Sequence, residues 1–186
     1  ETVNIPLVEG AKQAQKFCSE LLFTCVEKEG CMQGTNMDYV KQVRDAVSCR
    51  VVAAGGVSSV EEIAALEKIH CDVQLGMALY TGKVSLNDAF VACMDFEKSP
   101  LIPVIAQSVN GEVLMQAYAN KESLLKTFDC KKLTFYSRSR KELWTKGETS
   151  GNFLEVVRLR ADCDRDCILA TVIPVGPSCH TGSWTC

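Results

Sequence analysis

The residues best suited to chemistry lie near the C-terminal end of the chain. Three carboxylates alternate with other residues at Asp162, Asp164 and Asp166, and Cys163 stands between the first two. Further along the chain follow Cys179, His180 and Cys186. Thiolates and imidazole suit zinc, whereas clustered carboxylates suit magnesium. The types and spacing of these side chains therefore indicate a place that holds metal and activates water.

A second group of polar side chains precedes these candidates, between residues 137 and 151. Its cationic and hydroxyl groups, with one indole, belong to Arg138, Arg140, Trp144, Lys146, Thr149 and Ser150. Guanidinium, ammonium and hydroxyl groups bind phosphate and other anions well. The composition alone favours a solvated surface loop over a phosphate site, so a role for this stretch depends on further observations.

Composition and charge exclude several classes of function. The net charge is −3, which gives no general attraction to nucleic acid or to a membrane surface. No apolar run reaches the ~18 residues of a membrane span, and no signal peptide is visible. We therefore expect a cytoplasmic protein with reduced cysteines. Four cysteines in or beside apolar stretches are expected to pack as small hydrophobes, namely Cys18, Cys49, Cys71 and Cys93.

The elements that position these residues form two groups, and the first is an α/β pattern over residues 1–93. A leading helix, with Leu7 and Cys18 on one face, precedes three strand–helix units with strands at 21–24, 50–54 and 71–75. The helices are expected to begin at Asn36, at Ser58 with Glu61, and at Ser85 with Asp88. Such alternation predicts a parallel sheet with crossover helices.

Glycines follow the predicted strands and include Gly55, Gly56 and Gly76. At the end of a parallel strand, glycine lets a phosphate approach backbone N–H groups closely. Ordinary tight turns use glycine as well, and the pattern by itself fits both interpretations.

The second group of elements begins after an expected linker at residues 94–100, and residues 101–186 are expected to form a compact α+β domain. Asn110 with Gly111 predicts a hairpin, and Asn120 predicts a helix start. Strands are expected at 104–108, 113–115, 133–136, 152–160 and 168–175. Cys167 is expected to point inward beside the last of them.

The first half resembles the last three strand–loop units of the histidine-pathway phosphoribosylformimino-aminoimidazole carboxamide ribotide isomerase, at residues 23–34, 52–57 and 75–84. The resemblance implies a partial TIM-type (β/α) barrel, made of the leading helix and three βα units. It assigns Thr24 to the active site and Gly55, Gly56 and Gly76 to phosphate binding. Met77 stands where that family has a lysine. The family's acid and base aspartates belong to earlier strands, so we expect no isomerase activity from this half.

The second half resembles phosphoribosyl-AMP cyclohydrolase of histidine biosynthesis, and more strongly. The matching blocks are residues 112–118, 135–140, 143–151, 162–166 and 179–182. The resemblance implies a magnesium site at Asp162, Asp164 and Asp166. It implies a zinc site at Cys163, Cys179 and Cys186, with ligands from both subunits of a homodimer. His180 would relay a proton, and the substrate would be bound by Arg138, Arg140, Trp144, Lys146, Thr149 and Ser150.

The reaction implied is hydrolytic opening of the N1–C6 bond in the adenine ring of phosphoribosyl-AMP, a nucleotide, with zinc-activated water. The product of this step is the substrate of the isomerase. The chain therefore also fits the C-terminal part of a bifunctional isomerase–cyclohydrolase whose barrel half is inactive. A zinc-stapled binding module, in which the cysteines only hold the fold, is the remaining alternative.

Overall fold

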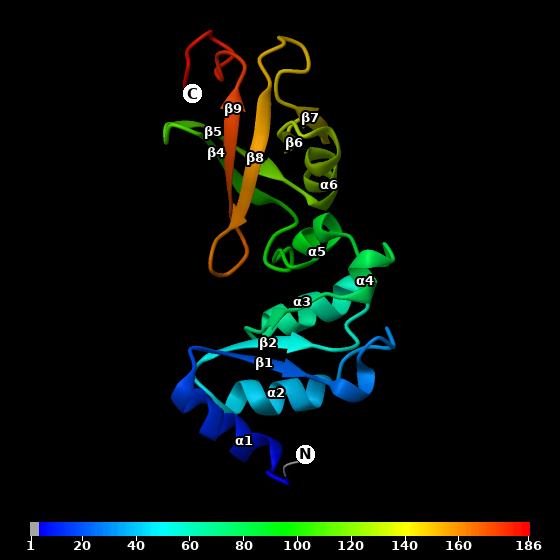
Figure 1. The fold of residues 1–186 in the computed structure, drawn as a ribbon. Helices are drawn as coiled ribbons and strands as arrows, with labels where there is room; N and C mark the ends of the chain where they lie inside the picture. The colour runs from blue at the N-terminus through cyan, green and yellow to red at the C-terminus, as the bar shows by residue number, and fades with distance from the viewer. Residues whose placement is uncertain (1–3) are drawn as a thin grey trace. The chain divides into compact units, whose positions relative to one another are not determined.

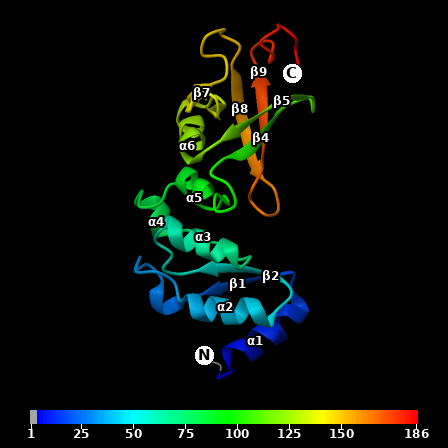
Figure 2. The same cartoon turned by 180° about the vertical axis from the view of Figure 1, so that it is seen from behind.

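The computed structural model describes residues 4–186 and divides into two compact units, Glu1–Cys93 and Met94–Cys186. Figures 1 and 2 show the helices and strands of each unit, coloured in chain order from the N-terminus to the C-terminus. Among the residues described, no helix has the length and apolar character to cross a membrane.

The first unit is built on a three-stranded parallel sheet in the order β1-β2-β3. Its strands are β1 (Glu20–Thr24), β2 (Arg50–Ala54) and β3 (Asp72–Val73). Its helices are α1 (Leu7–Ala14), α2 (Met37–Ala46), α3 (Val60–Lys68), α4 (Met77–Tyr80) and α5 (Leu86–Ala92), with 3-10 turns η1 (Gln15–Phe17) and η2 (Val26–Lys28). Helices α2 and α3 lie on opposite faces of the sheet (Figure 1). The predicted parallel sheet with crossover helices is confirmed.

Two of the predicted helix starts are confirmed by side-chain caps. The Asn36 carboxamide accepts a hydrogen bond from the Tyr39 N–H at 3.1 Å, and the Ser85 hydroxyl accepts one from the Asp88 N–H at 3.0 Å. Each cap satisfies a backbone donor that has no partner within the helix. The third strand is shorter than predicted, because pairing with β2 ends at Val73.

The predicted start of α3 at Ser58 with Glu61 is wrong by one residue. Ser59 caps the helix by accepting from the Glu62 N–H at 3.3 Å. The Glu62 carboxylate accepts from the Ser58 N–H at 2.9 Å and from the Thr35 N–H at 2.8 Å. Glu62 thereby ties the helix start to the loop before α2, a tertiary contact that local spacing does not reveal.

The four cysteines expected in the core differ in their burial. Cys71 is buried, and burial raises the pKa of its thiol. Cys49 and Cys93 are half-buried, whereas Cys18 is exposed. The prediction for Cys18 is wrong because α1 ends at Ala14 and the chain leaves the helical path before Cys18.

The second unit contains a mixed four-stranded sheet in the order β5-β4-β9-β8 and a two-stranded sheet, β6-β7. Its strands are β4 (Ile102–Ser108), β5 (Val113–Ala119), β6 (Thr134–Ser137), β7 (Glu142–Thr145), β8 (Leu154–Ala161) and β9 (Ile168–Pro174), and its helix is α6 (Lys121–Cys130). The hairpin at Asn110 and Gly111 joins β4 and β5 as predicted. Strand β7 was not predicted, and it lies within the stretch interpreted as a polar loop.

Helix α6 begins with a reciprocal cap and packs against the unit's core. The Asn120 side chain accepts from the Ser123 N–H at 2.8 Å, and the Ser123 hydroxyl accepts from the Asn120 N–H at 2.9 Å. The largest fully buried side chains of this unit are Phe135, Ile102, Leu114, Leu124, Leu133, Leu154 and Ile168. They come from β4, β5, β6, β8, β9 and α6 and from Leu133, which directly precedes β6.

The segment expected as a linker belongs to the second unit. The backbone N–H of Asp95 donates to the carbonyl of Arg165 at 2.8 Å, which attaches the segment to the β8–β9 connection. The segment therefore contacts the loop that carries the candidate magnesium ligands.

Candidate active site

The three aspartates lie together on the connection between β8 and β9. One carboxylate oxygen from each of Asp162, Asp164 and Asp166 falls within a group no wider than 4.8 Å. Asp162 Oδ1 also accepts from the backbone N–H groups of Asp166 at 3.1 Å and Cys167 at 3.2 Å, which closes the turn. The predicted cluster is thus formed, and its oxygen donors suit a hard divalent cation.

A cationic side chain that the sequence did not single out contacts this cluster. Lys98 Nζ lies 2.9 Å from Asp164 Oδ2 and 3.0 Å from Asp166 Oδ2. The hydrogen bond from Lys98 holds the pKa of the Asp164 carboxyl below its ordinary value, and the same contacts raise the pKa of Lys98. The only signal for this contact was one lysine in an otherwise unremarkable linker.

Two of the three predicted zinc ligands lie together in the segment after β9. Cys179 lies close enough to Cys186 to raise the pKa of the Cys186 thiol. The Thr181 hydroxyl donates to Cys179 Sγ at 3.1 Å and lowers the pKa of that thiol. His180 Nδ1 lies 3.8 Å from the same sulfur. This pair of thiols beside an imidazole is chemically suited to zinc.

The segment that carries these thiols is fixed to β5. The Cys186 N–H donates to the carbonyl of Leu114 at 2.8 Å, and Trp184 Nε1 donates to Glu112 Oε2 at 3.1 Å. The sequence offered no signal for the Glu112 contact. Together the two bonds hold Cys186 beside Cys179 in a segment that has no helix or strand.

Lys146 is buried, although the sequence placed it in a polar loop. Its Nζ donates to the carbonyl of Asn152 at 3.3 Å. Burial lowers the pKa of Lys146, and the thiols of Cys179 and Cys186 act in the opposite direction. The side chain therefore supplies positive charge on the side of the molecule that carries the two thiols.

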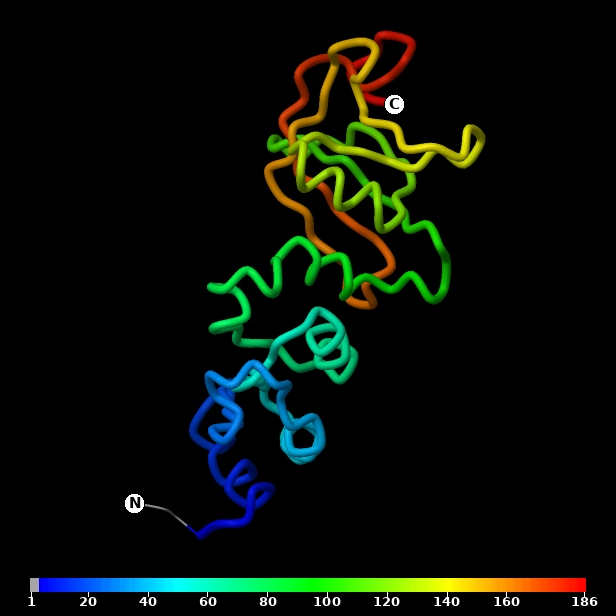
Figure 3. The backbone as a smooth tube through the Cα atoms, turned by 90° about the vertical axis from the view of Figure 1, so that its right-hand side faces the viewer, coloured from blue at the N-terminus to red at the C-terminus, as the bar shows by residue number. Residues whose placement is uncertain are grey.

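Cys163 lies away from this pair within a single chain. It is exposed in the β8–β9 connection, which precedes β9, whereas the Cys179 segment follows β9. Figures 1 and 3 show the two segments beyond opposite ends of that strand. Among residues 4–186, only the three aspartates form a group of three or more potential ligands.

The β6–β7 hairpin and β5 enclose a hollow of about 220 Å³. Its lining residues are Gln116, Ala117, Tyr118, Tyr136, Ser137, Arg138 and Trp144. The Arg138 guanidinium lies 4.1 Å from the centre of the Tyr118 ring, and the Trp144 ring packs on Phe135 at 5.4 Å between centres. A cation beside aromatic rings suits a ligand with both a flat ring and a negative charge.

The other predicted substrate residues do not line this hollow. Arg140 Nε lies 3.2 Å from Glu142 Oε1 in the hairpin turn. Thr149 and Ser150 are exposed after β7, where the Ser150 hydroxyl accepts from the Asn152 N–H at 3.3 Å. Of the predicted substrate residues, Arg138 and Trp144 thus line the same hollow, whereas Arg140, Thr149 and Ser150 lie in exposed turns.

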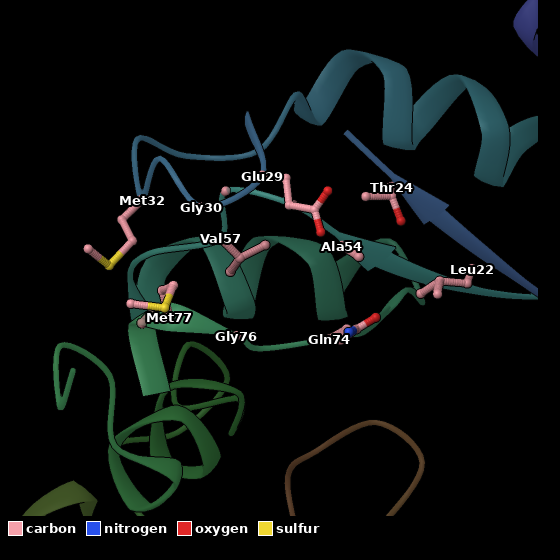
Figure 4. Close-up of a pocket in the computed structure, with 13 residues that line it drawn as sticks. Leu22, Thr24, Glu29, Gly30, Met32, Ala54, Val57, Gln74, Gly76 and Met77 are labelled. Carbon is pink, nitrogen blue, oxygen red and sulfur yellow. The ribbon is translucent and has the colours of Figure 1, made fainter. Parts of the chain in front are cut away.

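The glycines and threonine singled out in the first unit line one hollow of about 220 Å³ (Figure 4). They are Thr24, Gly55, Gly56 and Gly76, joined by Glu29, Gln74 and others. A Cβ added to Gly55 would lie 2.5 Å from the Cys25 carbonyl oxygen, and one added to Gly56 would lie 2.5 Å from that of Gly34. Both glycines also have positive φ, so the loop requires them at these positions.

Comparisons with known families match both halves of the chain. The family model described as phosphoribosyl-AMP cyclohydrolase matches residues 115–186, and the one described as histidine biosynthesis protein matches residues 1–85. These ranges contain the aspartates, the thiols and the glycine-lined hollow described above.

Curated relatives agree with the family models. The "Histidine biosynthesis bifunctional protein HisIE" of Shigella sonnei and that of Escherichia coli K12 are each 54% identical over 95 residues, or 50% of this chain and 47% of the relative. The protein of the same name from Photobacterium profundum is 49% identical over 100 residues, 53% of this chain and 48% of the relative. The chain thus spans about half the length of the curated relatives it matches. Its second half is thus similar to phosphoribosyl-AMP cyclohydrolase, and its first half is similar to the histidine biosynthesis protein family.

Proposed function

We propose that this chain hydrolyses phosphoribosyl-AMP, adding water across the N1–C6 bond of the adenine ring and opening it. The observation that carries the proposal is the Cys179 thiol, which lies 3.8 Å from His180 Nδ1 and accepts from the Thr181 hydroxyl at 3.1 Å, within the segment matched to the cyclohydrolase family. Ring opening of a cyclic amidine requires an activated water and a group that moves its proton.

Zinc fits the thiol pair, because one thiol has a lowered pKa and thiolate is the form that binds the metal. Cys179 and Cys186 would hold the ion together with Cys163 of the partner subunit. When bound, zinc lowers the pKa of a coordinated water and polarises it. The exposed imidazole of His180 would accept the proton from such a water.

Cys163 is the reason to propose a homodimer. In one chain it belongs to the β8–β9 connection, whereas Cys179 follows the other end of β9, so a set of three thiolates requires a second copy. A twofold axis would bring the β8–β9 connection of each chain to the C-terminal segment of the other and create two equal sites.

The nucleotide is proposed to occupy the hollow around Arg138. The guanidinium would meet the phosphate, and the Trp144 and Tyr118 rings offer flat apolar faces to the base. Magnesium fits the three aspartates through its preference for oxygen ligands and would orient the phosphate or the ribose. Arg140, Lys146, Thr149 and Ser150 remain proposed substrate residues, with Arg140 requiring release from Glu142.

The test is an absorbance assay of ring opening with the purified chain. Protein stripped of metal by a chelator should be inactive, and zinc with magnesium should restore turnover of phosphoribosyl-AMP. Cys179→Ser should stay inactive under the same conditions. If stripped protein and the variant both turn over normally, the proposed zinc chemistry is wrong. If the chain binds zinc but never opens the ring, the cysteines only hold the fold, as in a zinc-stapled module.

For the first unit, we infer a partial (β/α) barrel whose glycine loops bind a phosphate without isomerase turnover. The hollow around Gly55, Gly56 and Gly76 supports phosphate binding, since such loops need only backbone N–H groups. Glu29 and Thr24 line the same hollow, but Met77 also lines it and stands where the isomerase family has a lysine, so binding without turnover is expected. Supplying the cyclohydrolase product and following its ring-opened ribulose form by chromatography tests this inference.

A further inference from the structure

We propose that Lys98 is a tethered competitor for magnesium, occupying Asp164 and Asp166 in the metal-free protein and leaving them when the cation binds. This inference rests on the magnesium site of the proposed function and adds a residue that controls its occupancy. Its basis is the double contact of Lys98 Nζ, at 2.9 Å to Asp164 Oδ2 and 3.0 Å to Asp166 Oδ2.

The ammonium and a divalent cation would compete for these carboxylates. Asp164 Oδ2 and Asp166 Oδ2 both face Lys98 Nζ, and both carboxylates belong to the group whose oxygens lie within 4.8 Å of one another. A magnesium ion bound to the same carboxylates would stand within a few ångströms of the ammonium, where like charges repel. We therefore expect Lys98 to move away from the cluster when the metal binds.

The side chain can move without disturbing the backbone that carries it. The Asp95 N–H is bonded to the carbonyl of Arg165 at 2.8 Å, and the Glu97 N–H to Asp95 Oδ1 at 2.9 Å. After Lys98, the Ser99 hydroxyl donates to the carbonyl of Leu101 at 2.8 Å. The backbone is thus held on both sides, while the Lys98 side chain is 53% exposed and has solvent to move into.

A second carboxylate is placed to receive the displaced ammonium. Asp95 Oδ2 lies 3.7 Å from Lys98 Nζ and outside the group of the three aspartates. A rotation of the lysine stem exchanges Asp164 and Asp166 for Asp95, so displacement does not leave the ammonium without an anion. Lys98, in the segment before β4, therefore competes with the metal and lowers the affinity of the three aspartates for it.

The experiment is a calorimetric titration of the full chain with magnesium chloride. Lys98→Met should bind magnesium roughly tenfold more tightly than the wild type, because the wild type must give up an exposed double ion pair. Lys98→Arg keeps a competing cation and should bind about as weakly as the wild type. Lys121→Met removes a lysine that lies over the Phe96 ring, outside the acidic cluster, and should leave the affinity unchanged.

A second measurement follows the displacement itself. Acylation of Lys98 by acetic anhydride, quantified by mass spectrometry, should speed up several-fold on addition of magnesium, while acylation of Lys121 should not change. Equal magnesium affinity in wild type and Lys98→Met, or unchanged Lys98 acylation, would overturn the competitor role and leave the magnesium site intact. If even Lys98→Met binds no magnesium, the competitor and the magnesium site are both wrong. Zinc-dependent ring opening would then stand or fall separately.

Discussion

Cys163 belongs to the connection before strand β9 and Cys179 to the segment after it, and these two segments lie beyond opposite ends of the strand (Figures 1 and 3). The strand has 7 residues and spans roughly 20 Å, whereas zinc–sulfur bonds measure about 2.3 Å. One chain therefore cannot bring both thiols to a single ion without refolding its central sheet. If all three cysteines bind zinc, the site must be shared between two chains, and several expected outcomes follow from this relationship.

The first expected outcome concerns the zinc content of the protein. Metal analysis of the purified protein should give about one zinc per chain, and Cys179→Ser should lose zinc and ring-opening activity together. Cys130→Ser is the matched control, because Cys130 is an exposed cysteine at the end of α6. A Cys179→Ser protein that retains its zinc and full activity would contradict the assignment.

The aspartates should affect magnesium and not zinc. Asp164→Asn removes one charge from the oxygen cluster, so it should weaken the magnesium dependence of turnover and lower the rate, with zinc content unchanged. Asp129→Asn, at the exposed end of α6, serves as the control for loss of one carboxylate. Loss of zinc with a normal magnesium response would mean that the two sites have been interchanged.

The two neighbouring thiols should ionise at different pH. The hydroxyl of Thr181 stabilises the Cys179 thiolate and lowers its pKa, while the contact with Cys179 raises the pKa of Cys186. In metal-free protein, alkylation by iodoacetamide should therefore begin at lower pH for Cys179 than for Cys186. Thr181→Val should move the Cys179 profile to higher pH, and Thr181→Ser should restore it. Coincident profiles in the wild type would contradict this account.

Local sequence patterns predicted the parts of the fold that local interactions determine. The caps at Asn36, Ser85 and Asn120 each satisfy a donor three residues away, so their sequence spacing is sufficient to place them. Asn110 and Gly111 likewise fix a hairpin within a few residues. Alternation of strand and helix was enough to predict the parallel sheet of the first unit.

Contacts between distant residues account for what the sequence did not predict. Lys98 meets Asp164 and Asp166 across more than sixty positions, and no local pattern reports this. Glu112 meets Trp184 in the same way. The position of Cys163 relative to Cys179 also became visible only once β9 was placed in its sheet.

Gly56 should be needed for both the stability and the phosphate binding of the hollow in the first unit. Gly56→Ala places a methyl group 2.5 Å from the Gly34 carbonyl oxygen at positive φ, and should reduce the free energy of unfolding by about 1–3 kcal/mol and weaken phosphate binding. Gly82→Ala has a similar φ but nothing within 4 Å, so it isolates the conformational cost. Urea denaturation and a phosphate titration measure the two effects. Equal losses in both variants would show that close approach is unimportant.

The most direct test of the account mixes two inactive variants. Cys163→Ser and Cys179→Ser, dissociated and reassembled together, should form mixed dimers with one complete site: intact Cys163 from the second variant, and intact Cys179 and Cys186 from the first. Random assortment makes half of the dimers mixed, so ring opening of phosphoribosyl-AMP should return to roughly a quarter of the wild-type rate. A mixture of Cys179→Ser with Cys186→Ser is the control and should stay inactive, since both changes damage the same side of the site. Failure of the first mixture to exceed either variant alone would contradict a cyclohydrolase site shared between two chains.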